Sequence, residues 1–167
     1  MKKRYSVPVR RLLLTAALIL LLVPAAASAR TSAPGDGTLV VKDGNVGLIT
    51  IQAKGGVIGR FDQGILKIRD PNPDDDIDAV VTGAESSHQV TENLTRYSGK
   101  NIRFRFIGGH FTIRIIGGNG VDLSAVGQGS VILQGAGTLD DGTYSFNGDA
   151  PRELPLLAKP FDLGASG

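Results

Sequence analysis

The sequence predicts an all-β, glycine-rich protein, built as an antiparallel β-sandwich or a partly closed barrel. Short runs of Val, Ile, Leu, Phe and Thr alternate with polar residues, which is the period of a half-buried strand. The 167 residues include 23 glycines, and glycine pairs interrupt the runs about every 8–12 residues. Beyond residue 30 no stretch carries an apolar stripe of helical period.

The alternation divides the predicted strands into two sets. Two glycine-containing pairs, Asp43-Gly44 and Gly108-Gly109, are predicted two-residue hairpin turns, because glycine tolerates the positive φ that such turns need. For the polar segment 84–99, the sequence leaves open whether the chain forms a strand or one helical turn. The first set is expected near 38–42, 46–53, 57–61, 65–69, 78–82 and 89–93, and the second near 102–107, 110–116, 121–125, 130–134 and 142–146.

A faint internal duplication accompanies the two sets. Ile49-Thr50-Ile51 and the glycine turn after it resemble Ile113-Arg114-Ile115 and its glycine turn, 64 residues later. Two similar halves could bury each other's apolar faces. The alternative architecture is a short β-solenoid, which the recurring glycine turns favour. The lack of a fixed period of about 20–30 residues argues against it.

The termini set the domain organisation. Residues 1–29 have a basic start, an apolar run from Leu12 to Val23 and a small-x-small ending, which predicts a cleaved bacterial signal peptide. Residues 30–37 are expected to be a linker, 38–149 the β domain and 150–167 an extended tail lying over it. We therefore expect an exported protein, periplasmic, surface-bound or extracellular, with no membrane span after cleavage.

Charge and composition exclude several function classes. The whole chain has 18 basic and 16 acidic residues, but residues 1–29 hold five of the basic ones and no acid. The remainder has 13 basic and 16 acidic residues, a net charge of −3, which disfavours nucleic acid as a partner. The absence of cysteine excludes disulfides, thiol nucleophiles and cysteine-ligated metals.

An acidic loop between two predicted strands is a candidate cation site. Oxygen-bearing side chains at alternating positions of a curled loop suit Ca²⁺, and this loop resembles the start of a calcium-binding loop. Asp75 stands where such loops need glycine, and the alternative is a solvated connection. No other cofactor is expected. The candidate ligands are Asp70, Asn72, Asp74, Asp76 and Asp78.

The predicted hairpin around Gly108-Gly109 carries the candidate ligand site. Its register would bury Ile102, Phe104, Phe106, Phe111, Ile113 and Ile115 on one face. The other face would carry Arg103, Arg105, His110 and Arg114, with Arg103 directly opposite Arg114. Opposed arginines repel unless an anion lies between them. An anionic glycan, a lipid phosphate or another envelope component would fit, as would an acid from a neighbouring strand.

The pattern contains no catalytic constellation. Ser87 and His88 are sequence neighbours that point to opposite faces of a strand, and no serine has a nucleophile-elbow glycine pattern. The sequence therefore predicts a non-enzymatic binding or structural module of the cell envelope or extracellular space. The alternative is a secreted glycan hydrolase with paired Asp or Glu residues. The sequence predicts no particular oligomeric state for the protein.

Overall fold

The computed structural model describes residues 35–72 and 78–164, all within the second of two compact units, Ser32–Gly167. The predicted signal peptide and most of the predicted linker lie outside these residues. No helix occurs in the two described stretches, and so none that could cross a membrane. The strands are β1 (Gly37–Arg69), β2 (Val80–Thr91), β3 (Leu94–Gly135), β4 (Thr143–Phe146), β5 (Arg152–Glu153) and β6 (Lys159–Leu163).

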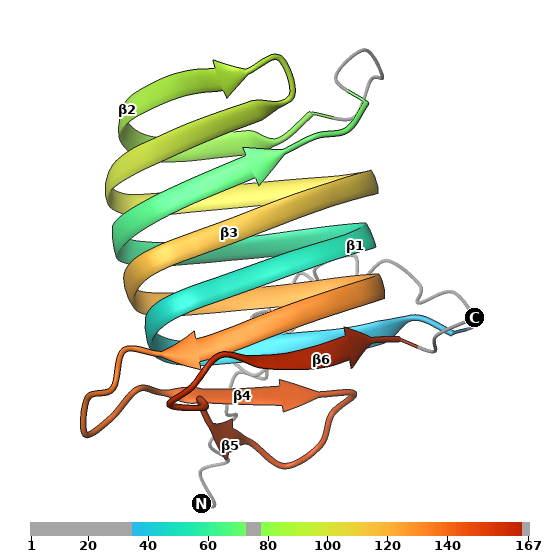
Figure 1. The fold of residues 1–167 in the computed structure, drawn as a ribbon, viewed down its shortest axis with the longest axis vertical. Coiled ribbons are helices and arrows are strands. Elements are labelled where there is room, and N and C mark those ends of the chain that lie inside the picture. The colour runs from blue at the N-terminus through green and yellow to red at the C-terminus, as the bar shows by residue number, and fades with distance from the viewer. Residues whose placement is uncertain (1–34, 73–77, 165–167) are drawn as a thin grey trace, which may run out of the picture. The chain divides into compact units, whose positions relative to one another are not determined.

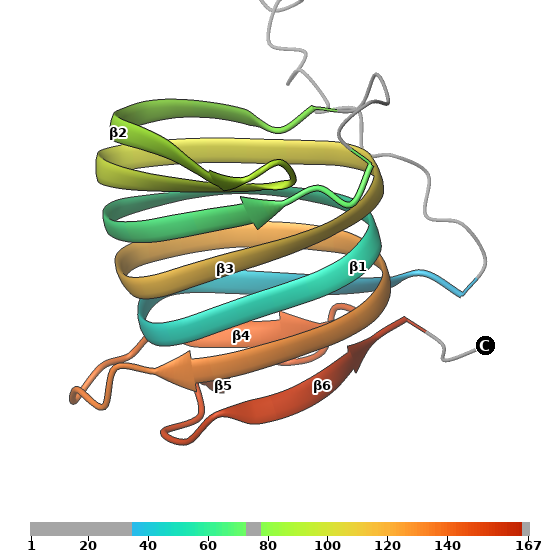
Figure 2. The same cartoon turned by 45° about the horizontal axis from the view of Figure 1, so that its top comes forward.

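The two long strands, β1 and β3, coil around each other as an antiparallel pair (Figures 1 and 2). Ile49 lies opposite both Ile115 and Leu133, which are 18 residues apart in the chain. Gly127 likewise lies opposite both Gly37 and Gly55. Each turn of one strand therefore pairs with two turns of the other, and one turn takes about 18 residues.

The coil is flattened into two walls that pack face to face. Most straight segments coincide with predicted strands, which confirms the all-β antiparallel prediction, but the strand predicted at 89–93 is wrong, because β2 ends at Thr91 and the unpredicted segment 94–98 follows a turn. The sheet has two ends and does not close into a barrel. The front wall, which faces the viewer in Figure 1, contains 48–53, 65–69, 86–89, 94–98, 111–116, 129–134 and β6, and the rear wall contains 38–42, 56–61, 80–82, 102–107, 121–126 and β4.

Sandwich and solenoid thus describe two aspects of one chain. The layers are those of a sandwich, whereas the winding is that of a coil. No repeat of adjacent turns appears in the sequence, because each turn of β1 has turns of β3 as neighbours. The two similar segments are neighbours within the front wall, since Ile49 pairs with Ile115 and Ile51 with Ile113, and do not face each other across the core as predicted. The polar segment 84–99 is strand with one interruption at 92–93, and contains no helical turn.

Both predicted hairpin turns are wrong. Asp43-Gly44 lies inside β1 and Gly108-Gly109 inside β3, and neither strand reverses there. The predicted positive φ is present at Asp43 (50°), Gly108 (102°) and Gly109 (60°) but not at Gly44. Positive φ bends the chain out of the sheet plane at these corners, so that it passes from one wall to the other instead of pairing with itself.

The core lies between the walls. All six residues of the predicted apolar face, including Phe104 and Phe106, are buried, which confirms that part of the prediction. Phe106 packs on Phe111 with ring centroids 5.1 Å apart. Gly59 makes room for Phe104, because a Cβ at Gly59 would lie 2.5 Å from the Phe104 ring. Burial of this apolar surface is the main force that holds the two walls together.

The two ends of the coil differ. At one end β4, β5 and β6 carry an aromatic cluster of Tyr144, Phe146 and Phe161, with centroid distances of 5.1–5.9 Å. Leu154 of the C-terminal tail is buried there, but Leu156 and Leu157, expected to cover the domain, are 66% and 76% exposed. At the other end, β2 is the first strand of the sheet order and is mostly exposed.

Candidate functional site

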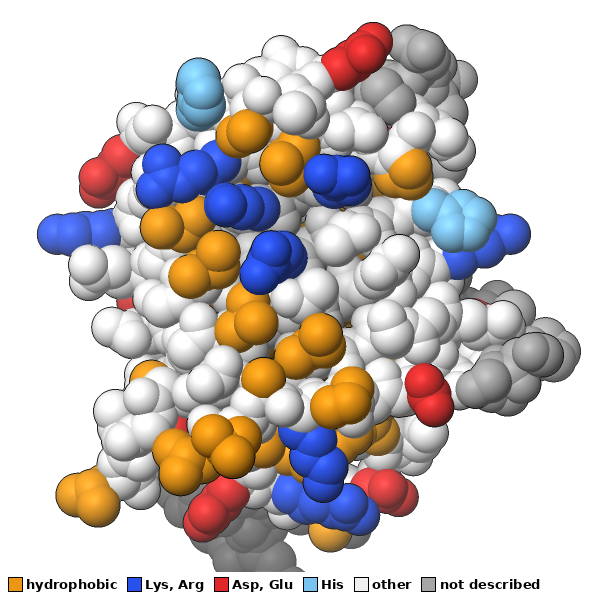
Figure 3. Space-filling view, in the orientation of Figure 1, with side chains coloured by type: hydrophobic (Ala, Val, Ile, Leu, Met, Phe, Trp, Pro, Cys, Tyr) orange, Lys and Arg blue, Asp and Glu red, His pale blue; other side chains and the backbone are white. Residues whose placement is uncertain are grey.

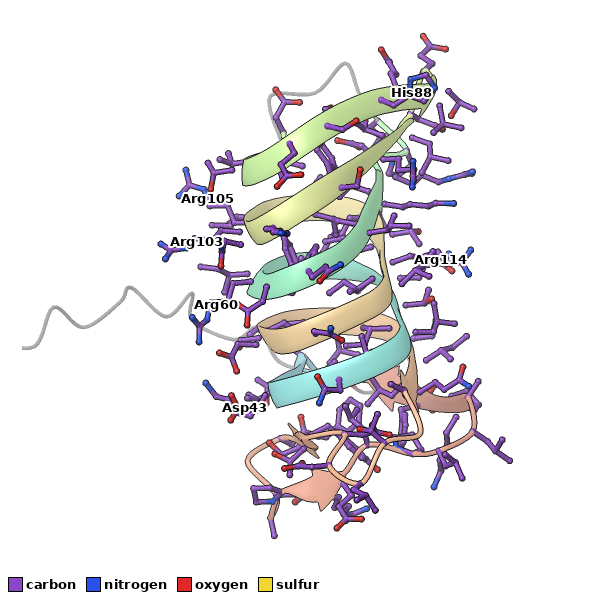
Figure 4. All side chains as sticks on the ribbon, turned by 90° about the vertical axis from the view of Figure 1, so that its left-hand side faces the viewer. Asp43, Arg60, His88, Arg103, Arg105 and Arg114 are labelled. Carbon is purple, nitrogen blue, oxygen red and sulfur yellow. The ribbon has the colours of Figure 1, made fainter. Side chains whose placement is uncertain are left out.

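The structure divides the predicted ligand site between the two walls. Arg103 and Arg105 project from the rear wall and Arg114 from the front wall, on opposite sides of the molecule in Figure 4. His110 is exposed near the Gly108-Gly109 corner, opposite Lys54. The predicted pairing of Arg103 with Arg114 is wrong, because it depended on a hairpin that does not form.

The front wall nevertheless carries opposed cations, from other strands. Arg114 lies opposite Lys67, Lys67 opposite Arg96, and Arg96 opposite His88. Directly opposite residues of neighbouring antiparallel strands have Cβ atoms about 4.5–5.5 Å apart. We name these four residues, His88, Arg96, Lys67 and Arg114, the basic ladder. It runs across the strands, along the axis of the coil.

Among the described residues, the basic ladder has no acidic partner. Within residues 35–72 and 78–164 the ion pairs are Arg60–Asp122 and Arg152–Asp149, and neither includes a ladder residue. Figure 3 shows Lys and Arg side chains gathered on the upper part of the front wall. Opposed like charges destabilise a sheet. An anion bound on the ladder would therefore remove an existing repulsion as well as form new contacts.

A shallow hollow lies against the basic ladder. It has a volume of about 490 Å³ and is lined by three cationic side chains, Lys67, Arg69 and Arg114. No acid is among its described lining residues, and Thr50, Gln52 and Thr112 supply hydroxyl and amide groups. The hollow thus combines positive charge with neutral hydrogen-bonding groups, a combination that suits a charged sugar better than a bare anion.

The rear wall has opposed arginines too, but one of them is paired. Arg60 lies opposite both Arg103 and Asp122, and its Nη2 is 2.6 Å from a carboxylate oxygen of Asp122. Asp122 also accepts a hydrogen bond of 3.1 Å from the Asp43 amide. The Asp43 amide and the Arg60 guanidinium together lower the pKa of Asp122 from its ordinary value. On the rear wall, Asp122 therefore compensates the charge of Arg60 but not that of Arg103 or Arg105.

The acidic loop is only partly described. Asp74 and Asp76 lie outside the described residues. Asp70 accepts a hydrogen bond of 2.9 Å from the Asn72 amide, and Asp70 and Asp78 line a hollow of about 170 Å³ with Glu92. Among the described residues no group of three His, Cys, Asp or Glu side chains is placed to hold a metal ion. The hollow is also smaller than typical ligand sites.

The chain matches no protein-family model, and no curated protein or solved structure is significantly similar to it. The site is therefore interpreted from its own geometry.

Sequence reasoning missed Lys67, Arg69 and Arg96. Lys67 and Arg69 alternate with the buried residues Leu66 and Ile68, so their outward direction was predictable from period-2 alternation. Arg96 lies in a segment too polar to be identified as a strand. The residues that lie beside them could not be predicted without knowledge of how the chain winds, because the strands that meet at the basic ladder are far apart in the sequence.

Proposed function

We propose that this chain is an exported, non-enzymatic module that binds an anionic polysaccharide along its front wall. The observation that carries the proposal is the basic ladder: three cations and a histidine in line on neighbouring strands, with no ion pair to an acid in the part of the chain that the structure describes. The neutral groups of the adjoining hollow, Thr50, Gln52 and Thr112, would hydrogen-bond to sugar hydroxyls.

The direction of the basic ladder supports an extended ligand. Neighbouring strands are about 4.8 Å apart, so the ladder presents positive groups at about that interval along the coil axis. A linear polysaccharide with a carboxylate on each sugar would place successive charges against successive strands. A small monovalent anion would meet only one or two members of the ladder.

The net charge of the chain does not oppose this binding. At physiological ionic strength the Debye length is about 8 Å, so acids on distant surfaces are screened from the front wall. The local field at the ladder is set by Lys67, Arg69, Arg96 and Arg114 instead. A local positive surface on a chain of net negative charge would also restrict binding to ligands that fit the ladder.

Oligogalacturonates of increasing length, with a neutral galactan as the control, test the proposal by calorimetric titration. The protein is the chain from Arg30 onward, which keeps the whole core because every buried hydrophobic residue that the structure describes lies between Leu39 and Leu163. We expect affinity to rise with oligomer length and the galactan not to bind. The double variant Lys67→Gln/Arg114→Gln should lose about tenfold in affinity or more, since charge-assisted hydrogen bonds disappear.

The matched control is the double variant Arg103→Gln/Arg105→Gln, which removes the same charge from the rear wall. It should bind the oligomers like the unmodified chain. An equal loss in both double variants, or binding to duplex DNA as tight as to the oligogalacturonates, would contradict the assignment to a polysaccharide on the front wall.

A further inference from the structure

The rear wall exposes large aliphatic side chains. Ile58 is 59% exposed, Val80 43% and Ile107 56%. Ile58 and Val80 both lie opposite Arg105, and Ile107 lies opposite Gly56, one diagonal step from Ile58. The three side chains therefore form one patch. Leu48 and Ile116, which point outward from the front wall, are half-buried instead, although Val90 near the end of β2 is 48% exposed.

A strip of cations borders the aliphatic patch. Arg60 lies opposite Arg103, and Figure 4 shows Arg60, Arg103 and Arg105 projecting from the same side of the molecule, one above another. Ile58 and Arg60 share a strand and a face two residues apart, a distance of about 6.8 Å. The rear wall thus carries a charged strip with Arg60 and Arg103, and beside it an aliphatic strip in which Arg105 lies between Ile58 and Val80.

A hollow of about 660 Å³ connects the two strips. It is lined on the charged side by Lys42, Arg60 and Arg103, and on the aliphatic side by Ile58 and Val80. Arg105 also lines it, and Asp122 is its one acidic residue among those described, so four cations face one carboxylate. The volume lies in the range of ordinary ligand sites. This combination selects a partner that is anionic and apolar at once.

We propose that the rear wall docks on the surface of an anionic phospholipid bilayer. Arg103 and Arg105 would bind lipid phosphates through their guanidinium groups, whose planar donors match phosphate oxygens. Ile58 and Ile107 would enter the boundary between headgroups and acyl chains, which removes their surface from water. A soluble anion would leave both isoleucines in water, so the aliphatic strip favours a membrane. This inference is independent of the polysaccharide proposal, because it uses the opposite wall.

Vesicle flotation with the chain from Arg30 onward tests the inference. The probes are vesicles of phosphatidylcholine alone and vesicles of equal parts phosphatidylcholine and phosphatidylglycerol. We expect binding to the anionic vesicles only. Arg103→Gln and Arg105→Gln should each weaken it about fivefold, and Ile58→Asn should weaken it about tenfold while leaving every charge in place.

The control is Lys67→Gln/Arg114→Gln, which removes two charges from the front wall and should leave vesicle binding unchanged. Thermal melting serves to check that each variant is folded, which we expect because the substituted side chains face outward. An absence of binding to anionic vesicles overturns the inference. So does an equal loss in the front-wall control, or binding that survives Ile58→Asn but not the loss of arginines, because simple charge attraction would then explain it.

Discussion

The front and rear walls both place cations opposite one another across neighbouring strands, but within residues 35–72 and 78–164 only the rear wall pairs one of them with a carboxylate. On the rear wall, Asp122 pairs with Arg60 at 2.6 Å and relieves the opposition of Arg60 and Arg103. On the front wall, Lys67 stands between Arg96 and Arg114 without such a partner. Within one fold, a carboxylate therefore compensates one of the opposed cations on the rear wall, whereas the opposed cations of the front wall have no such partner among the described residues.

The aliphatic residues differ in the opposite sense. The rear wall leaves Ile58 and Ile107 more than half exposed, whereas the front wall half-buries its outward Leu48 and Ile116. A row of cations beside neutral polar groups on the front wall, and cations beside exposed aliphatic side chains on the rear wall, suit different kinds of ligand. The comparison teaches that one coil can present two unlike surfaces, because its period-2 alternation leaves the outward residues of each wall free to vary.

The largest expected effect comes from the corners that join the walls. Gly127 has a φ of 145°, and a Cβ there would lie 2.2 Å from the Lys54 carbonyl oxygen and 2.9 Å from the Gly55 Cα. We expect Gly127→Ala to lower the free energy of unfolding by about 3 kcal/mol or more, since backbone must move. Urea denaturation measures this. Gly117→Ala is the control, because its Cβ would meet nothing within 4 Å, and should cost only about 1–2 kcal/mol for its positive φ. Equal costs would contradict the close approach of the corners.

A second prediction concerns the removal of the rear-wall carboxylate that pairs with Arg60. Asp122→Ala should lower stability at neutral pH by about 1 kcal/mol, because the Asp43 amide loses its hydrogen-bond acceptor. The pKa of Asp122 is lower in the folded chain than in the unfolded one, so its contribution is present above about pH 4 and lost as the pH falls through the folded value.

Urea denaturation across the acid range checks this prediction. The variant should lose less stability on acidification than the unmodified chain, although Asp141, whose pKa is also lowered by hydrogen bonds from Thr138, keeps part of the acid dependence in both proteins. Asp162→Ala on the front wall is the control and should change neutral-pH stability by less than about 0.5 kcal/mol. Parallel acid profiles for the unmodified chain and Asp122→Ala would refute the role of this carboxylate.

The smallest expected effect tests the charge difference between the two walls most directly. Lys67→Gln should raise stability in low salt by about 0.3 kcal/mol, because Arg96 and Arg114 lose the like charge between them. The gain should vanish in high salt, where the repulsion is screened. Arg103→Gln should gain less, since Asp122 already compensates Arg60. Thermal melting at two salt concentrations measures these changes in stability. A Lys67→Gln variant that is less stable than the unmodified chain would show that the charge of Lys67 is compensated on the front wall.

The prediction of the site failed at one identifiable step. The sequence supported the outward direction of Arg103, Arg105 and Arg114, and each is exposed. It did not support a choice between a hairpin and a corner at Gly108-Gly109, because both need positive φ there. Choosing the hairpin paired Arg103 with Arg114, although their neighbours are Arg60 and Lys67. Local backbone preferences were right and the partner strands were wrong.

The sequence by itself determined the all-β class, which residues of the core strands face inward, and that the chain bends at Gly108-Gly109, because period-2 alternation and glycine act over a few residues at a time. Only the tertiary structure decided which strands become neighbours. That choice depends on how β1 and β3 wind around each other over about 18 residues per turn, so that Lys67 meets Arg96 and Arg114. The winding is set by the joint burial of Phe104, Leu133 and the rest of the core, a sum over the whole domain that no local pattern contains.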